Sequence, residues 1–311
     1  ETTSKEQAII PPYPFDLTTL QTEAYRFYNI TPSQTLQVAQ RLYLSGLVSY
    51  PRTSSQKIPP GIDIQKIINS LSKKYMKETS FITRKHPIEG SKSDPAHPAI
   101  HPTGDTNGLS KLSGEELKIY ELIVRRFISS LCDNALVLNR KIEVSINDLV
   151  FQTKGLHIKK KGWMEVYPAR LSERDIPEIN GDVEILEVRI EEKQTQPPKR
   201  YSPASLVSEL ARRNLGTKST RSAIIETLYD RGYIKERSIE ATPIGISLIS
   251  TLEKHSQIII DEKLTRDFEK EMNAIQSAQS AKKDIKNIEK KEEKVIEKAK
   301  GIILKIEKEF R

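Results

Sequence analysis

The chain has 311 residues, 36% of them hydrophobic and 30% charged, with a formal net charge of +8 at pH 7. This length predicts about two or three domains, and the positive charge favours a polyanionic partner such as nucleic acid. The sequence has neither a long apolar run nor a secretion signal, so we expect an intracellular, cytoplasmic protein with no membrane partner. Its only cysteine, Cys132, excludes an intrachain disulfide and a cysteine zinc cluster, so no zinc is expected.

The N-terminal segment predicts a pair of helices with an extended exit. Residues 1–16 are proline-rich and are predicted to be irregular. Apolar residues at helical spacing predict helices over 18–28 and 33–45, and Gly46 is expected to cap the second one. The following "LVSYPR", residues 47–52, is predicted to be extended because the residue before a proline avoids the helical region.

The middle of the chain predicts loops and then strands. Residues 53–112 are rich in loop signals, with a helix near 64–74, and an amphipathic helix is predicted over 114–132. Alternating apolar residues predict a β-rich block over 137–191, in "RKIEVSI", "LVFQTKGLHIKKKGWMEVYPA" and "GDVEILEVRIEEKQT", with turns at Gly155, Gly162 and Gly181.

The C-terminal part predicts helices. Residues 196–200, "QPPKR", are predicted to be a linker. Over residues 202–273, apolar residues again occur at helical spacing, which predicts helices. Residues 280–311 carry acidic and basic side chains four residues apart, which favours a solvated surface helix.

An internal repeat relates two of the helical segments. Residues 20–46 align with 206–232 at a constant offset of 186 without a gap. Both copies read as a helix, a turn with hydroxyl side chains, a second helix ending in "LYxxG", and a basic exit. This order is typical of a helix-turn-helix with a wing, which commonly faces a nucleic-acid backbone. A generic pair of antiparallel helices is the alternative interpretation.

Two motifs in the first half of the chain could carry chemistry. Tyr50 needs a nearby cation to act as a nucleophile, since a phenol is protonated at neutral pH. Arg52 would lie on the same side of an extended chain, and the alternative is an interfacial aromatic beside a solvated charge. In "DPAHPAIHPTG", residues 94–104, three prolines would hold His97 and His101 in a rigid, exposed loop, either for a ligand or with no partner.

A third motif, "NLGTKSTRSAIIETLYDRGYI", covers residues 214–234. It places Thr217, Lys218, Ser219 and Thr220 at a helix start, where N–H groups, hydroxyls and a lysine suit a phosphate. Simple helix capping is the alternative. Arg231 is a second candidate phosphate contact.

Taken together, these segments resemble the type IA DNA topoisomerases, and more closely their archaeal branch. The resemblance follows the chain in order, through "PPYPFDLTTLQTEAYR", "TLQVAQRLYLSGLVSYPRTSS", "DPAHPAIHPTG", "PPKRYSPASLVSEL" and "LGTKSTRSAIIETLYDRGYI". It implies an α+β, mostly helical, multidomain toroidal core with two winged-helix-like modules joined by a β-rich arch. The implied domains are the end of an arch segment at 1–12, a tyrosine-bearing gate domain at 13–136, a β-rich arch at 137–198 and a helical DNA-binding domain at 199–311.

The resemblance also implies a role for each candidate residue. Tyr50 would form a 5′-phosphotyrosyl link to one cleaved DNA strand, Arg52 would stabilise the charged transition state, and His97 would position the DNA. An ATP-independent strand passage and religation would follow. The implied DNA-binding residues are Gln40, His101, Thr217, Lys218, Thr220 and Arg231, and the implied partners are single-stranded DNA and underwound duplex DNA.

The sequence departs from the family pattern at several points. Thr217 and Lys218 occupy the segment in which bacterial members have an arginine, and His101 stands where they often carry one. The family's metal-binding TOPRIM domain would precede residue 1, and no DxD motif occurs in the sequence. We therefore expect a core that is incomplete for catalysis, with the ligands of Mg²⁺ in a TOPRIM domain in cis or in a separate subunit. The rival hypothesis is a non-catalytic double winged-helix protein that binds single-stranded DNA and stacks Tyr50 on a base.

Overall fold

A computed structural model describes residues 1–112, 114–280 and 285–309. It divides into two compact units, one formed by Glu1–Leu20 with Leu36–Pro198 and the other by Gln21–Thr35 with Lys199–Arg311. Helices and strands are mixed along the chain, so the predicted α+β class is confirmed. None of the helices in the described ranges combines the length and apolar composition needed to cross a bilayer.

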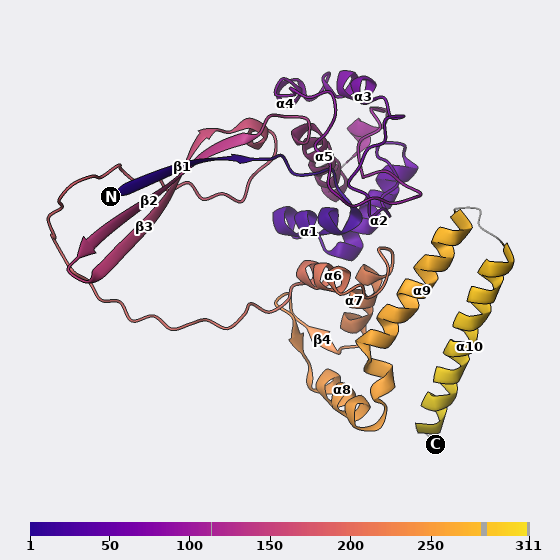
Figure 1. Ribbon diagram of the computed structural model, residues 1–311. Coiled ribbons are helices and arrows are strands. Elements are labelled where there is room, and N and C mark those ends of the chain that lie inside the picture. The colour runs from indigo at the N-terminus through magenta and orange to yellow at the C-terminus, as the bar shows by residue number, and fades with distance from the viewer. Residues whose placement is uncertain (113, 281–284, 310–311) are drawn as a thin grey trace. The chain divides into compact units, whose positions relative to one another are not determined.

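A three-stranded antiparallel sheet extends through the first unit (Figure 1). Its strands are β1 (Thr2–Ile9), β2 (Ala135–Ile146) and β3 (Leu149–Lys160), in that order. Every residue of β1 pairs with β2. The prediction of irregular structure over residues 1–16 is therefore wrong for β1, because its polar sequence gains a ladder partner about 130 residues away that local composition does not reveal.

The prediction of a third β segment, over residues 181–195, is wrong. Residues 181–195 form no strand, because no neighbouring strand supplies hydrogen-bond partners for them. Their apolar side chains are exposed, at Val183, Ile185, Leu186, Val188 and Ile190.

Gly155 lies inside β3 rather than in a turn. A Cβ at this position would lie 2.6 Å from the Arg174 carbonyl oxygen, so the glycine allows the close approach of the chain at Arg174. Gly162 begins a short 3-10 helix directly after β3, and Gly181 lies at a bend; both glycines have positive φ.

Helix α5 (Gly114–Ser129) supplies much of the buried core of the first unit from its second half. The residues Ile119, Tyr120, Ile123 and Phe127 of α5 are almost fully buried. The smaller elements are α3 (Ile64–Leu71), α4 (Met76–Thr79), η1 (Leu109–Lys111) and η2 (Gly162–Glu165). The helices predicted near 64–74 and over 114–132 are confirmed, each ending three residues early.

Two predicted helices connect the units. Helix α1 (Leu17–Tyr28) and helix α2 (Pro32–Leu44) match their predictions to within one residue. The first residues of α1 and most of α2 belong to the first unit, and Gln21–Thr35 belongs to the second. The four-domain division expected from the family stays a prediction.

The second unit is helical apart from one short hairpin. In chain order it contains α6 (Pro203–Arg212), α7 (Arg221–Asp230), β4 (Ile234–Lys235), β5 (Glu240–Ala241), α8 (Pro243–His255), η3 (Gln257–Ile260), α9 (Glu262–Ser280) and α10 (Ile285–Glu309). Helices α9 and α10 lie side by side (Figure 1), with Lys298 bonded to Glu271 at 2.8 Å. The predicted Lys/Glu helix is confirmed over α10, and residues 281–284 and 310–311 of that prediction lie outside the described residues.

The repeat is confirmed by its backbone geometry. In both copies the second helix ends at a glycine with positive φ, +76° at Gly46 and +66° at Gly232. Each glycine N–H donates to the carbonyl of the "LY" tyrosine, at 2.9 Å and 2.8 Å. The next residue in each copy donates to the "LY" leucine, at 3.0 Å. The two copies thus build the same helix end at the same offset.

Candidate active site

Tyr50 lies between two aromatic side chains in the first unit. Its ring centroid is 4.4 Å from that of His97 and 5.2 Å from that of Tyr43, the second contact being edge-to-face. The three side chains come from α2, its exit segment and the histidine loop. The structure therefore brings together two of the three predicted catalytic residues and adds Tyr43, which the sequence analysis missed.

The histidine loop is held against the exit segment by short hydrogen bonds. Ser49 N–H donates to the His101 carbonyl at 2.9 Å, and the His101 N–H donates to Ser49 Oγ at 3.0 Å. Thr53 Oγ1 donates to the His97 carbonyl at 3.2 Å. These bonds lie on both sides of Tyr50, so they fix the backbone of the nucleophile candidate relative to His97.

Arg52 lies in a bend of the chain rather than in an extended segment. The chain turns at residues 51–52, where Thr53 N–H donates to the Pro51 carbonyl at 2.9 Å. The prediction of an extended exit is wrong here, because proline fixes one dihedral angle and the polar segment 53–57 folds back. The Arg52 side chain is half-buried and has no carboxylate partner within the described ranges, so its guanidinium is available to an anion.

The prediction that His101 is exposed is wrong. Its side chain is 5% exposed, and its Nδ1 lies 2.7 Å from the Ala99 carbonyl. Burial lowers the pKa of His101, against the opposing effect of the Ala99 carbonyl, which favours the neutral imidazole. His101 lies between two β-bridges, Ile100 with Phe15 and Pro102 with Val48, and Ile100 and Val48 are themselves buried. His97, by contrast, is partly exposed.

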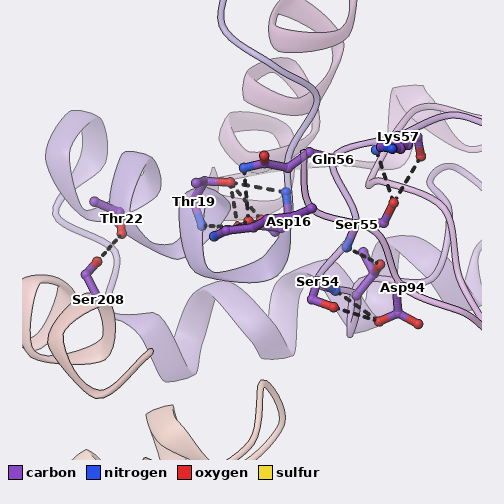
Figure 2. Close-up of polar contacts among 11 residues, drawn as sticks. Asp16, Thr19, Thr22, Ser54, Ser55, Gln56, Lys57, Asp94 and Ser208 are labelled. Carbon is purple, nitrogen blue, oxygen red and sulfur yellow. Dashed lines mark hydrogen bonds and ion pairs between the residues drawn. The ribbon is translucent and has the colours of Figure 1, made fainter. Parts of the chain in front are cut away.

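A buried carboxylate anchors the segment that follows Tyr50 (Figure 2). Asp16 is 2% exposed and accepts hydrogen bonds from Thr19 N–H, from Gln56 Nε2 and from Lys92 Nζ, at 2.7, 3.2 and 3.1 Å. It caps α1 and at the same time binds the chain at residues 56 and 92. The capping signal, Asp followed by Thr three residues later, is readable in the sequence, whereas the two distant partners are not.

A second carboxylate orders the loop next to Tyr50. Asp94 accepts hydrogen bonds from the N–H and the hydroxyl of Ser54, both at 3.1 Å (Figure 2), and from Ala96 N–H at 3.1 Å. Asp94 therefore links the start of the histidine loop to the segment after Arg52.

Tyr43 occupies a position whose role recurs in the second copy of the repeat. There Tyr229, the equivalent residue, donates its hydroxyl to the carbonyl of Glu236 at 2.8 Å, and Glu236 is the residue aligned with Tyr50. In both copies the "LY" tyrosine thus contacts the same position of the exit segment. We infer that Tyr43 positions the Tyr50 ring.

Replacing Tyr43 by alanine is expected to slow DNA cleavage by the active enzyme roughly two- to tenfold, since an aromatic pair contributes about 0.5–1.5 kcal/mol. Tyr43→Phe retains the ring and should cleave at the wild-type rate. Single-turnover cleavage of a labelled oligonucleotide measures both rates. Equal rates for Tyr43→Ala and wild type would show that the ring contact has no positioning role.

The predicted phosphate-binding residues lie at both ends of α7 in the second unit. Thr217 N–H donates to Thr220 Oγ1 at 2.9 Å, and the two hydroxyls are 3.1 Å apart. Thr220 is the N-cap residue, but its side chain makes no capping bond to the helix. The Thr217 hydroxyl instead accepts a hydrogen bond from Ser219 N–H at 3.3 Å, so local turn bonding accounts for part of this motif. Lys218 lies between them, and Arg231 is the exposed C-cap of the same helix.

Gln40 lies on α2, ten residues before Tyr50. Its side-chain oxygen is buried without a hydrogen-bond partner among the described residues. An amide oxygen accepts hydrogen bonds, so it suits the amino group of a base rather than a phosphate.

The described residues contain no group of three or more His, Cys, Asp or Glu side chains that could hold a metal ion. Cys132 is buried, and burial raises the pKa of its thiol to about 12. The thiol therefore stays protonated and is a poor metal ligand.

Comparison with known proteins identifies the family. The sequence model of the DNA topoisomerase family matches residues 1–287. The chain therefore belongs to the DNA topoisomerases. DNA topoisomerase 1 of Methanothermobacter thermautotrophicus is 45% identical over 88% of this chain and 38% of that protein. DNA topoisomerase 1 of Pyrococcus horikoshii is 41% identical over 99% of this chain and 45% of that protein. The resemblance to the archaeal type IA enzymes is thereby confirmed.

A solved structure supports the same assignment. Full-length topoisomerase I from Thermotoga maritima matches 96% of this chain with a TM-score of 0.75 and 25% identity, over 51% of that protein. The chain thus spans about half, or less, of the length of the relatives it matches. The rival hypothesis of a non-catalytic single-stranded-DNA-binding protein is not favoured.

Proposed function

We propose that this chain forms the tyrosine-bearing core of a type IA DNA topoisomerase that cleaves one DNA strand. The Tyr50 phenol oxygen bonds to the scissile phosphorus as the bond from phosphorus to the 3′ oxygen breaks. Tyr50 loses its hydroxyl proton, and the leaving 3′ oxygen gains one. The products are a 5′-phosphotyrosyl link and a free 3′-hydroxyl. The observation that carries the proposal is the Tyr50 ring held 4.4 Å from His97.

The neighbours of Tyr50 have complementary tasks in this reaction. Arg52, which has no carboxylate partner in the described ranges, stabilises the negative charge that builds up on the phosphate oxygens in the transition state. His97 contacts the same phosphate or the deoxyribose beside it and orients the strand. His101 acts through its packing behind Ser49, which fixes the loop that carries His97.

The remaining candidates bind the strand on either side of the cleavage point. Thr217, Lys218 and Thr220 offer hydroxyls, N–H groups and a positive charge to a phosphate, and Arg231 offers a second cation. Gln40 accepts a hydrogen bond from a base. The substrate is single-stranded DNA or underwound duplex DNA, because only unpaired strands leave the Watson–Crick edges of their bases free to meet a side chain such as Gln40.

The larger architecture follows the family. The two repeat copies act as winged-helix-like modules, with the β4–β5 hairpin as the wing of the second, and the β1–β2–β3 sheet belongs to an arch. The module with Tyr50 moves away after cleavage, a second strand passes through, and the reverse attack by the 3′-hydroxyl reseals the break. The phosphodiester energy remains in the tyrosyl bond, so no ATP is consumed.

The described residues do not suit the Mg²⁺ ion on which this family generally depends, because they provide no cluster of ligands. The ligands would come from a TOPRIM domain, in cis or as a separate subunit. We expect the chain supplemented with such a domain from a relative to cleave DNA, and the experiments on cleavage use this supplemented protein.

The direction of the covalent link tests the proposal. An oligonucleotide labelled at its 3′ end should transfer its label to the supplemented protein, because the 3′ fragment carries the phosphate bonded to Tyr50. The same oligonucleotide labelled at its 5′ end should leave the protein unlabelled. Denaturing gel electrophoresis reads both results. Transfer of the 5′ label would rule out the 5′-phosphotyrosyl intermediate.

A further inference from the structure

A pocket of about 560 Å³ adjoins the candidate active site in the first unit. His97 lines this pocket and also contacts the ring of Tyr50, so the pocket begins at the side chain beside the nucleophile. Its volume lies within the range of roughly 300–1,000 Å³ that is usual for small-molecule sites. None of the residues assigned to DNA binding above, apart from His97, lines it.

The walls of the pocket are rigid and apolar. Five prolines line it, and each fixes one backbone dihedral angle, which makes the shape independent of a ligand. These prolines come from three segments of the chain: Pro59, Pro60, Pro87, Pro95 and Pro98. Flat apolar walls of this kind suit the faces of a base and a deoxyribose.

The acidic side chains at the pocket are already bonded to protein donors. Glu89 accepts a hydrogen bond from Ile58 N–H at 2.7 Å, and Asp94 accepts bonds from Ser54 and Ala96. Figure 2 shows Asp94 turned toward Ser54.

The basic side chains at the pocket are available. Lys57 and His86 line the pocket, are exposed, and form no ion pair within the described ranges. Within the described ranges, the hydrogen bonds of Lys57 involve its backbone, with Ser55 and Ala99. The pocket therefore combines apolar walls with a lysine ammonium and an imidazole, both of which can donate hydrogen bonds to a phosphate.

We propose that this pocket binds the nucleotide on the 3′ side of the cleaved bond, the one that remains attached to Tyr50. The proposal rests on the proposed function. In the cleaved state, this nucleotide is joined to Tyr50 through its 5′ phosphate, whereas the other fragment ends in a free 3′-hydroxyl and has no covalent bond to the protein. A pocket on the same compact unit as Tyr50 stays next to the attached nucleotide throughout the reaction. Its base and sugar lie against the prolines, and Lys57 and His86 bind its next phosphate.

Binding of a short probe tests the pocket separately from cleavage. The probe is a fluorescent thymidine trinucleotide with a 5′ phosphate, and its dissociation constant is measured by fluorescence anisotropy. The double variant Lys57→Ala/His86→Ala should bind it about tenfold more weakly than the wild-type protein, because two hydrogen bonds to the phosphate are lost, one of them from a charged ammonium. Lys57→Arg should retain most of the affinity.

The matched control is Lys66→Ala, which removes an exposed lysine of α3 in the same unit. It should change the affinity less than twofold. Equal affinities for the double variant and the wild type would overturn the pocket assignment. If covalent trapping then still depended on Tyr50, the proposed function would stand without this subsite. Absence of trapping by the supplemented wild-type protein would overturn both.

Discussion

Replacing Tyr50 by phenylalanine is expected to abolish the covalent protein–DNA complex of the active enzyme. The phenylalanine ring keeps the contacts with His97 and Tyr43, so the fold and the stacking should persist while the reacting oxygen is absent. The amount of DNA-linked protein after denaturation measures the effect, and it should fall below detection. Binding of single-stranded DNA should remain within a few-fold of the wild type.

The neighbouring Tyr43→Phe variant is the matched control. It removes a phenol oxygen from the residue in contact with Tyr50, yet it should form the complex at the normal level. Persistence of the covalent complex in Tyr50→Phe would exclude Tyr50 as the nucleophile and favour a role in stacking on a base.

Replacing Arg52 by alanine is expected to slow cleavage by about 10²–10³-fold, the usual effect of removing one group that stabilises a transition-state charge. Arg52 has no carboxylate partner within the described ranges, so its removal leaves no unpaired buried acid there and should not unfold the unit. Single-turnover cleavage measures the loss. Arg52→Lys should recover part of the rate, since it restores the charge but not the bidentate geometry.

Arg125→Ala is the control for loss of a positive charge. Arg125 bonds to Glu78 at 3.3 Å on the surface of the first unit, and its removal should leave the cleavage rate unchanged. An Arg52→Ala variant as fast as Arg125→Ala would assign Arg52 to the solvated surface. A variant that lost DNA binding and cleavage in equal measure would assign Arg52 to ground-state binding.

The sequence predicts the helical parts of this protein well, because their signals are local. The spacing of apolar residues and the glycine after each "LY" motif place α1, α2 and their counterparts α6 and α7. The repeat is also readable, since a gapless offset preserves the same backbone bonds in both copies. These signals do not depend on distant partners.

The strands are less predictable, because a strand requires a partner that local sequence does not identify. Segment β1 looks irregular in isolation but pairs with β2, whereas 181–195 has the alternation of a strand and no partner. The burial of a side chain is likewise difficult to predict from local sequence. His101 and His97 lie in one proline-rich motif, yet folding buries the His101 side chain and leaves that of His97 partly exposed. The two β-bridges that flank His101 pair this motif with residues of other segments, Phe15 and Val48.

The candidate site also has a part that the sequence predicts and a part that it does not. The sequence indicates Tyr50, Arg52 and His97, but not the bend at Arg52, the contact with Tyr43, or the buried Asp16 that binds Gln56 and Lys92. Each of these depends on chain segments brought together by folding.

Identification of the amino acid that carries the DNA is the most direct test of the proposed chemistry. The covalent complex formed by the supplemented protein is digested with a protease and a nuclease, and the peptide bearing a nucleotide is sequenced by mass spectrometry. The expected peptide contains residues 47–52, with the added mass of a 5′-linked nucleotide on Tyr50. A nucleotide on any other residue would contradict the assignment of Tyr50 as the nucleophile.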